Sequence, residues 1–361
     1  MASALFNPFT LRGLTLPNRI VVSSMCQYSS EAGSANDWHL MHLGQFAMGA
    51  AGLVMTEATH VSAVGRISHR CLGLYSDDNE ASLKRVVDFC RRYGVAKLGI
   101  QLAHAGRKGS ANPPALGGKP LGEGEHPWLT EAPSALPFGP GWHIPAALTR
   151  DGLTRVKQQF VDATRRAERI GFDLLELHCA HGYLLHEFLS PISNRRDDEY
   201  GGGSAKRMRF PLEVAEAVRA VWPADRPLAV RVSATDWVEG GWTPEETVIL
   251  ARELKALGCD LIDVSSGQLD PRQQIPFGPG YNVPLAEQIK KGAGIATMAV
   301  GMITKPRQAE EIVVSGRADL IAIARAIMDD PRWAWHAARE LAAEAPYAPN
   351  YARCSPGQWK P

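Results

Sequence analysis

Residues 154–178 read TRVKQQFVDATRRAERIGFDLLELH, and they form the unit from which the fold can be predicted. The first part has apolar residues at helical spacing, with Lys and Arg on the opposite face: Val156, Phe160, Ala163 and Ala167. Gly171 stands where a glycine commonly ends a helix. The run that follows, 173–178, is almost continuously apolar, as a strand covered on both faces must be. A helix followed by a buried strand is the repeat of an α/β fold with a parallel sheet.

Similar units extend in both directions along the chain. Seven more short apolar runs are found at 20–24, 52–56, 97–102, 227–232, 260–264, 296–300 and 319–324. Amphipathic segments separate most of them, among them 204–222, 244–257 and 308–314, and Thr243 with Glu246 forms a capping box before the second of these. Eight strands with intervening helices predict an α/β fold, a (β/α)8 TIM barrel, with residues 1–361 in a single domain. A doubly wound open sheet is the alternative, because periodicity does not show closure.

Two stretches do not follow this alternation of strand-like and helical segments. Residues 104–150 are rich in proline and glycine and form a long excursion after the third strand, which is typical of a functional lid or flap. The tail, 345–361, has no helical period and carries Tyr347, Tyr351 and Trp359. We expect this C-terminal tail either to pack on its own barrel or to contact a neighbouring subunit.

Charge and composition exclude several classes of protein. The 39 Lys and Arg residues nearly balance the 38 Asp and Glu residues, so no basic surface for nucleic acid or an anionic membrane is expected. The six cysteines form no CxxC motif, which favours reduced thiols over disulfides or a metal cluster. The first residues lack the pattern of a signal peptide, and no apolar run approaches the ~20 residues of a membrane span. We therefore expect a cytoplasmic protein that acts on small neutral molecules.

Polar residues follow nearly every predicted strand, at the end where barrel enzymes carry their catalytic groups. The most specific pattern is His178-x-x-His181-x-Tyr183. Two imidazoles can stabilise a carbonyl oxygen that gains negative charge, and a phenol can supply a proton. A histidine pair within a packed core is the alternative. No metal is predicted, because the other strand ends offer no clustered His or acidic residues to complete a ligand set.

Two arginines, Arg231 and Arg325, end predicted buried strands, where an unpaired guanidinium would be costly, so we expect each to have an anionic partner inside the barrel mouth. Arg325, with the loop at Gly301, is placed where barrels often bind phosphate through backbone N–H groups. Arg231, with Gln101, is placed to contact an electron-rich ring. The alternative for the arginines is a salt bridge to Glu57 or Asp263. Cys26, at the end of the first strand, is by itself typical of a small buried hydrophobe.

Four longer motifs connect these residues: 25–29 (MCQYS), 101–108 (QLAHAGRK), 181–185 (HGYLL), and LSP at 189–191 through YGG at 200–202. Their order and content resemble the old yellow enzyme family of FMN-dependent ene-reductases. More narrowly, they resemble its thermophilic-like branch and the bacterial xenobiotic reductases. The resemblance runs from Leu5 to about Arg353.

The resemblance implies an enzyme that binds FMN and uses NADPH or NADH to reduce the C=C bond of enones and enals, with hydride passing from flavin N5 to Cβ. His178 and His181 would hold the substrate carbonyl, and Tyr183 would protonate Cα. Cys26 would tune the flavin, and Tyr28 would line the substrate pocket. The flavin ring would be contacted by Ser24, Met25, Cys26, Ala58, Gln101 and Arg231. The phosphate would be held by Gly301, Met302, Ala324 and Arg325.

The resemblance also implies a homodimer or homotetramer in which a tail residue enters the partner's active site, Arg353 first and Trp359 second. Ser24 departs from the family pattern, since many relatives have proline there. Three rival functions can be compared with this one. A dienoyl-CoA-reductase-type enzyme would carry an Fe–S cluster, and the cysteines of this chain are not clustered. The second rival is a flavin-free lyase or aldolase, and the third is a non-catalytic barrel that binds a phosphorylated ligand.

Overall fold

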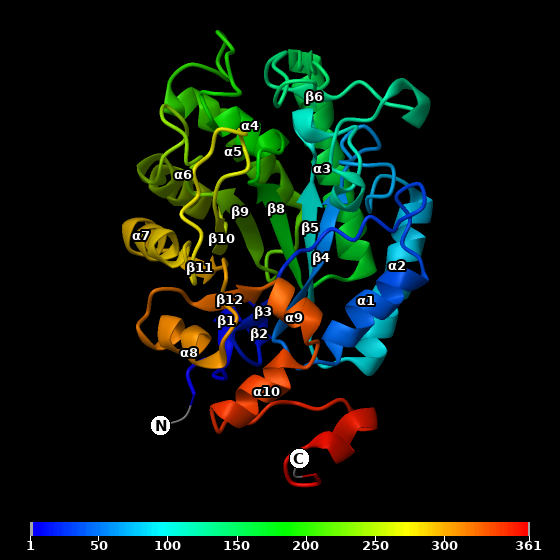
Figure 1. Cartoon of the computed structure of the whole chain (residues 1–361), viewed down its shortest axis with the longest axis vertical. Coiled ribbons are helices and arrows are strands. Elements are labelled where there is room, and N and C mark those ends of the chain that lie inside the picture. Colours follow the sequence, from blue (N-terminus) through cyan, green and yellow to red (C-terminus); the bar gives the residue numbers. More distant parts are fainter. Residues whose placement is uncertain (1–2, 360–361) are drawn as a thin grey trace.

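A closed barrel of eight parallel strands forms the centre of the molecule in a computed structural model, which describes residues 3–359 (Figure 1). The predicted domain spans residues 1–361 and the predicted tail ends at residue 361, so residues 1–2 and 360–361 of these predictions lie outside the described residues. Strand order around the barrel follows the chain, from β3 to β4, β5, β8, β9, β10, β11 and β12, and β12 pairs again with β3 through Ile321 and Ile20. This last pairing excludes the open sheet and confirms the (β/α)8 TIM barrel.

The barrel strands agree closely with the apolar runs of the sequence. Their bounds are β3 Ile20–Val22, β4 Leu53–His60, β5 Lys97–Ala103, β8 Leu174–Cys179, β9 Leu228–Ser233, β10 Leu261–Ser265, β11 Ala296–Ala299 and β12 Leu320–Ile323. Their burial is nearly complete because the interior of the barrel and the surrounding helices cover both faces.

Helices surround this barrel. They are α1 Asp37–Ala47, α2 Asp77–Tyr93, α3 Arg150–Ile170, α4 Leu184–Leu189, α5 Ser204–Val221, α6 Pro244–Ala256, α7 Val283–Ala293, α8 Pro306–Val314, α9 Arg325–Asp329 and α10 Trp333–Glu340. The expected end of α3 at Gly171 is found, with φ of 98°. The capping box of Thr243 and Glu246 is also found at the start of α6. Helix α3 begins at Arg150 because the Thr149 side chain caps its first turn.

The inside of the barrel is layered. Its lower layer, at the amino ends of the strands, is apolar and consists of Val21, Leu53, Met55, Leu174, Ala229, Leu261, Met298 and Leu320. A hairpin of β1 (Phe9–Leu11) and β2 (Leu14–Leu16), which the sequence analysis did not predict, packs Leu11, Leu14 and Leu16 against this layer. Each buried aliphatic side chain of this kind contributes about 1.5–3 kcal/mol to the free energy of folding.

The excursion after β5 lies over the opposite, carboxyl end of the barrel. It contains short 3-10 turns at Gly106–Lys108, Pro114–Leu116 and Glu123–Glu125, and a two-stranded sheet of β6 (Glu131–Ala132) and β7 (Ala146–Ala147). Arg107 ties it to the barrel, since its backbone N–H donates to Glu187 Oε1 at 2.8 Å and its Nη2 donates to the carbonyl of Leu269 at 2.9 Å.

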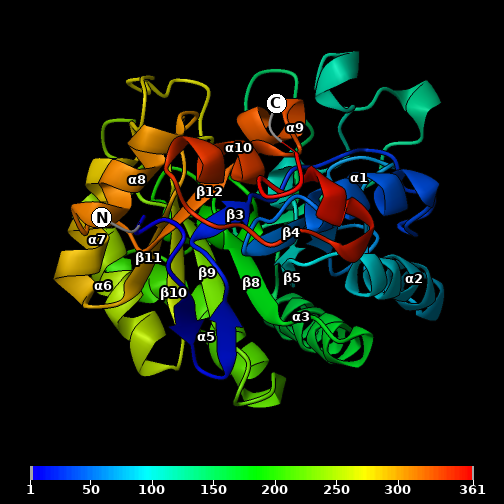
Figure 2. The ribbon, with the colours of Figure 1, turned by 90° about the horizontal axis from the view of Figure 1, so that it is seen from below.

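The C-terminal tail lies across α10, at the end of the molecule remote from β6 (Figures 1 and 2). Tyr347 stacks on Trp335 with ring centroids 4.4 Å apart, and the Arg339 guanidinium lies 5.4 Å from the Trp359 ring centroid. Part of the tail therefore packs on its own chain. Within residues 3–359, no helix has the length and apolar character needed to cross a membrane.

Candidate active site

Three aromatic side chains predicted from the HxxHxY motif come together at the carboxyl end of β8. The ring centroid of His178 lies 5.1 Å from that of His181 and 5.1 Å from that of Tyr183, and both contacts are edge to face. His178 is the second-last residue of β8, whereas His181 and Gly182 adopt positive φ, which turns the chain sharply before α4. This turn, which non-glycine residues rarely adopt, directs all three rings to one place.

The electrostatics of this cluster keep its members uncharged. Burial, and then the Arg231 charge, holds the pKa of both His178 and His181 well below the usual range, so both imidazoles are neutral. Burial raises the pKa of Tyr183 well above its usual value, so the phenol keeps its proton. His181 Nε2 lies 2.7 Å from Ser265 Oγ, whereas the buried Nδ1 of His178 has no partner among the described residues.

The loop after β3 brings Cys26 and Tyr28 against this cluster. Both pack with Tyr183 around Ile67 and Cys71. Burial and the neighbouring Glu57 raise the pKa of Cys26 well above its usual value, so the side chain is a thiol. Tyr28 has a φ of 50°, an unusual value for a tyrosine.

Glu57 supports this loop from beneath. Its Oε2 accepts a hydrogen bond from the backbone N–H of Gln27 at 3.1 Å, and its Oε1 lies 3.2 Å from His39 Nε2. Ser24, on the same loop, has a buried hydroxyl without a partner in the described part of the chain.

A cavity of about 420 Å³ lies beside the cluster, at the carboxyl ends of β9 to β12. It contains four of the predicted cofactor residues in the loops after β11 and β12, Gly301, Met302, Ala324 and Arg325, and Arg231 on its inner side. Ser265 and Tyr281 also line it, and Ser265 connects it to His181. Its volume is within the range of about 300–1,000 Å³ that is usual for small-molecule sites.

The outer part of this cavity presents backbone donors. Among the described residues, no acceptor is found for the backbone N–H groups of Gly301, Met302 and Arg325. Gly301 has a φ of 123°, and a Cβ there would lie 2.8 Å from the Tyr281 ring. Only glycine fits this position, and it leaves the N–H groups of the loop open to an anion.

The environments of Arg231 and Arg325 differ from those predicted from the sequence. Arg231 is buried and its Nε lies 3.0 Å from Asp263 Oδ2, so the salt bridge considered as an alternative is present. Arg325 is exposed as the first residue of α9, so the expectation that burial forces an anionic partner on it was wrong. Strand β12 ends at Ile323, which leaves Arg325 outside the barrel interior. Its charge is still at the rim of the cavity.

Of the remaining predicted site residues, some lie in or beside the barrel and others lie away from the cavity. Ala58 and Gln101 are paired in register on β4 and β5, and both are buried. Met25 is half-buried beside the core. Arg353 is exposed in the turn Pro349–Cys354 of the tail, and neither it nor Trp359 lines the cavity of this chain.

Lys108 is a residue of the site to which the sequence analysis assigned no role. Its Nζ donates to the carbonyls of His181 at 2.8 Å and Gln268 at 2.9 Å, and lies 5.1 Å from the Tyr183 ring centroid. Burial lowers the pKa of Lys108 to about 7. The long sequence separation between Lys108 and these partners explains why no local pattern indicated the contact.

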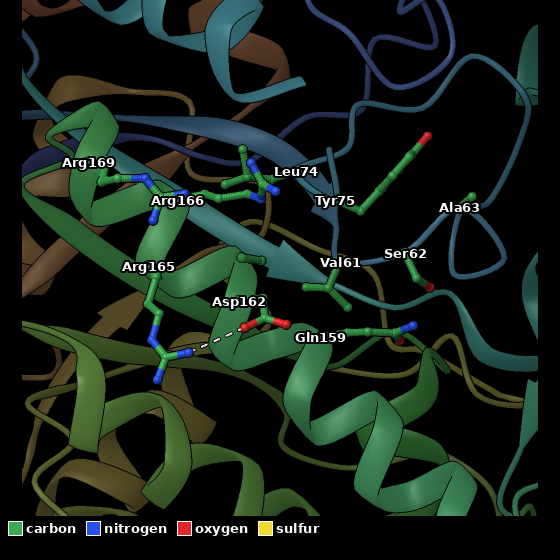
Figure 3. Close-up of a pocket in the computed structure, with 11 residues that line it drawn as sticks. Val61, Ser62, Ala63, Leu74, Tyr75, Gln159, Asp162, Arg165, Arg166 and Arg169 are labelled. Carbon is green, nitrogen blue, oxygen red and sulfur yellow. Dashed lines mark hydrogen bonds and ion pairs between the residues drawn. The ribbon is translucent and has the colours of Figure 1, made fainter. Parts of the chain in front are cut away.

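A second cavity, of about 380 Å³, lies outside the barrel between α3 and the loop after β4 (Figure 3). Three arginines of α3 line it, and each is paired with an acidic residue: Arg165 with Asp162, Arg166 with Asp77 and Glu80, and Arg169 with Glu80. Its charges are therefore balanced. No group of three or more potential metal-ligating side chains is found in residues 3–359.

The cavity at the barrel end has the features that FMN requires. It offers open backbone donors and the exposed cation of Arg325 for a phosphate. The guanidinium of Arg231 lines this cavity, and His178 and Ser24 carry buried polar atoms that have no partner among the described residues and could bind a polar ring.

Comparisons with known proteins agree with this geometry. Residues 4–344 match the model of the NADH:flavin oxidoreductase / NADH oxidase family. An NADPH dehydrogenase of Geobacillus sp. (strain WCH70) is 45% identical over 355 residues, which are 98% of this chain and 99% of that protein. An NADPH dehydrogenase of Listeria innocua serovar 6a is 46% identical over 360 residues, 99% of this chain and 100% of that protein.

Solved structures share the fold. Morphinone reductase is 26% identical with a TM-score of 0.79, covering 99% of this chain and 93% of its own. A 2-naphthoyl-CoA reductase in complex with 2-naphthoyl-CoA has a TM-score of 0.84 at 25% identity over 93% of this chain, which spans 52% of that protein. With the barrel-end cavity and the HxxHxY cluster, these matches show that the chain belongs to the NADH:flavin oxidoreductase / NADH oxidase family, the old yellow enzyme family, and is an FMN-dependent NAD(P)H oxidoreductase.

Proposed function

We propose that this enzyme is an ene-reductase that reduces the activated C=C bond of α,β-unsaturated carbonyl compounds such as enones and enals. The observation that carries the proposal is the cluster of two neutral imidazoles and one protonated phenol beside the cavity. Bound FMN supplies the transfer of hydride from NADPH or NADH to the β-carbon. The chain must then hold the substrate carbonyl and deliver one proton to the α-carbon.

His178 and His181 are proposed to bind the carbonyl oxygen. Reduction at the β-carbon moves negative charge onto this oxygen, and a neutral imidazole N–H can donate to it without a counter-ion. Because burial and Arg231 hold the pKa of both rings low, they remain donors of this neutral kind at ordinary pH. Ser265 fixes the orientation of His181 through the 2.7 Å contact to Nε2.

Tyr183 is proposed to protonate the α-carbon. Its raised pKa keeps the phenol protonated until a stronger base, the substrate enolate, is formed. Lys108 lies over the Tyr183 ring and its own pKa is lowered to about 7. In its charged form, Lys108 favours the negative charge that Tyr183 gains when it gives up its proton.

Contacts to the cofactor are proposed in two groups. Gly301, Met302, Ala324 and Arg325 hold the phosphate, as their open N–H groups and charge support. The ring is contacted by Ser24, Met25, Cys26, Ala58, Gln101 and Arg231, and Tyr28 faces the substrate. We further propose that the whole chain, 1–361, is one FMN-binding domain with 104–150 as its lid.

We also propose a homodimer or homotetramer in which the tail reaches a neighbouring active site. The exposed positions of Arg353 and Trp359 support this, because neither residue lines the cavity of its own chain. Either residue would then complete the partner's substrate pocket. Removal of residues 345–361 tests this, as described below.

Tyr183→Phe tests the proposed reaction. Rapid-mixing experiments should show that NADPH still reduces the bound flavin, whereas reoxidation by 2-cyclohexenone slows by about 10²- to 10⁴-fold, the usual contribution of a general acid. Tyr200→Phe is the control, because its phenol contacts Glu213 outside the barrel end, and both half-reactions should be unchanged. An unaltered alkene step in Tyr183→Phe would show that another group supplies the proton.

A further inference from the structure

A polar layer lies inside the barrel between its apolar floor and the ring cluster. Side chains alternate along each strand, so Glu176 and Asp263 point inward above Leu174 and Leu261 of the floor. Gln101 and Glu176 are opposite one another on β5 and β8, and Arg231 and Asp263 are opposite on β9 and β10. The four side chains are buried inside the barrel, with exposures of 1% for Gln101, Glu176 and Asp263 and 6% for Arg231.

Each of the two carboxyl groups holds one proposed cofactor residue. Gln101 Nε2 donates to Glu176 Oε1 at 2.8 Å, and Arg231 Nε lies 3.0 Å from Asp263 Oδ2. A primary amide has two different ends, and the end that meets Glu176 must be its NH2 group, because the contacted carboxyl oxygen accepts hydrogen bonds. The amide oxygen of Gln101 is thereby directed away from Glu176. Among the residues that the structure describes, no group donates to this oxygen.

We propose that Glu176 is a positioning residue for FMN: it orients the amide of Gln101 so that the amide oxygen is presented to an N–H group of the flavin ring. Asp263 holds the guanidinium of Arg231 in a corresponding way. The inference rests on the proposed contact between Gln101 and FMN. Without an acceptor at position 176, nothing would hold the NH2 group away from the flavin, and the amide could turn so that its NH2 group faces the N–H group of the ring.

This orientation is compatible with a protonated Glu176. Burial, followed by the nearby Asp263, raises the pKa of Glu176 to about 8. A protonated carboxyl group carries its hydrogen on one oxygen and still accepts through the other. Glu176 Oε2 is buried and has no partner in the described chain, so it can carry the proton while Oε1 accepts from Gln101.

Two substitutions at position 176 separate an orienting role from simple space filling. Glu176→Leu keeps roughly the volume but removes the acceptor, and the apolar layer beneath it tolerates leucine. Glu176→Gln keeps an amide oxygen that can accept from Gln101. Apoenzyme titrated into FMN, followed by quenching of FMN fluorescence, should show about tenfold weaker binding for Glu176→Leu, as expected for one lost hydrogen bond. Glu176→Gln should bind FMN within about threefold of the unmodified protein.

A double-mutant cycle then identifies the partner. In a Gln101→Met background, which has no amide to orient, Glu176→Leu should cause no further loss of FMN affinity. An equal, additive loss in both backgrounds would overturn the inference, because it would show that Glu176 acts only through packing. Glu176→Met provides the same comparison if the leucine variant does not fold, as judged by its thermal unfolding.

The same measurements distinguish this failure from failure of the proposed contact. If Gln101→Met alone leaves the Kd for FMN unchanged, Gln101 does not contact the cofactor, and both that contact and the inference are wrong. If Gln101→Met weakens FMN binding but Glu176→Leu does not, only the role of Glu176 is wrong. Because the readout is binding, neither result depends on which alkene the enzyme reduces.

Discussion

Replacing Gly301 with alanine should weaken FMN binding, and the size of this effect can be approximated from the structure. A non-glycine residue at a φ of 123° is strained by about 1–3 kcal/mol. The added Cβ would also lie 2.8 Å from Tyr281 Cε1 and 3.0 Å from Asn282 Nδ2, so the Tyr281 ring must move. Because Tyr281 lines the cavity, its movement and the distorted loop disturb the open N–H groups at the proposed phosphate site. A loss of about 1.4–2.8 kcal/mol of FMN binding free energy corresponds to about 10- to 100-fold weaker binding.

Gly316→Ala is the matched control. Gly316 also has positive φ, 73°, but a Cβ there meets nothing within 4 Å. Both variants should therefore lose about 1 kcal/mol or more of unfolding free energy in urea titrations, whereas only Gly301→Ala should show the higher Kd for FMN. Unchanged FMN affinity in Gly301→Ala, or an equal loss in both variants, would refute the assignment of this loop to the phosphate.

Three further results are expected. His181→Ala should lower kcat/KM for an enone by roughly 10²-fold, which corresponds to a loss of about 3 kcal/mol of transition-state stabilisation. An unchanged kcat/KM would exclude an oxyanion role for this imidazole. His60 is buried and its pKa is lowered to about 3, chiefly by burial, so the stability it confers is present above pH 6.5 and is lost as the pH falls towards 3. His60→Gln should flatten the decline of unfolding free energy between about pH 6.5 and 4 in urea titrations, and an identical slope would contradict the assignment. Deletion of residues 345–361 should raise KM for the enone and change the oligomeric state seen by light scattering, and no effect on either would exclude a role for the tail in a partner's site.

The barrel could be predicted because its strands are covered on both faces. Largely apolar runs such as 227–232 are found almost where the structure has strands, in this case Leu228–Ser233, and parallel order follows from the helices between them. Closure could not be predicted, because it depends on the pairing of Ile321 with Ile20 across almost the whole chain. The hairpin of β1 and β2 was missed because its strands are too short for alternation to be distinguished from chance.

The candidate site was predicted where its residues are close in sequence. The HxxHxY motif lies on one strand end and one turn, so its three rings could be placed together. The prediction that Arg325 is buried was wrong because β12 ends two residues earlier, at Ile323. Predictions of burial at strand ends therefore depend strongly on where the strand is taken to end.

The charged residues within the predicted strands could have been used to predict further contacts inside the barrel. Glu176 and Asp263 interrupt the apolar runs LLELH and LIDVS at positions that must point into the barrel. A buried charge requires a partner, and this requirement leads to Gln101 and Arg231. Which acid faces which partner depends on strand register, which the sequence does not specify.

The most direct test of the proposed reaction is to follow where hydrogen goes in a single turnover. Enzyme with bound FMN is mixed with deuterium-labelled NADPH and 2-cyclohexenone in water, and then with unlabelled NADPH in D2O. We predict deuterium at the β-carbon in the first case and at the α-carbon in the second, because Tyr183 exchanges its proton with solvent. Deuterium at the carbonyl carbon, or recovery of the alkene unchanged while NADPH is consumed, would contradict alkene reduction at this site.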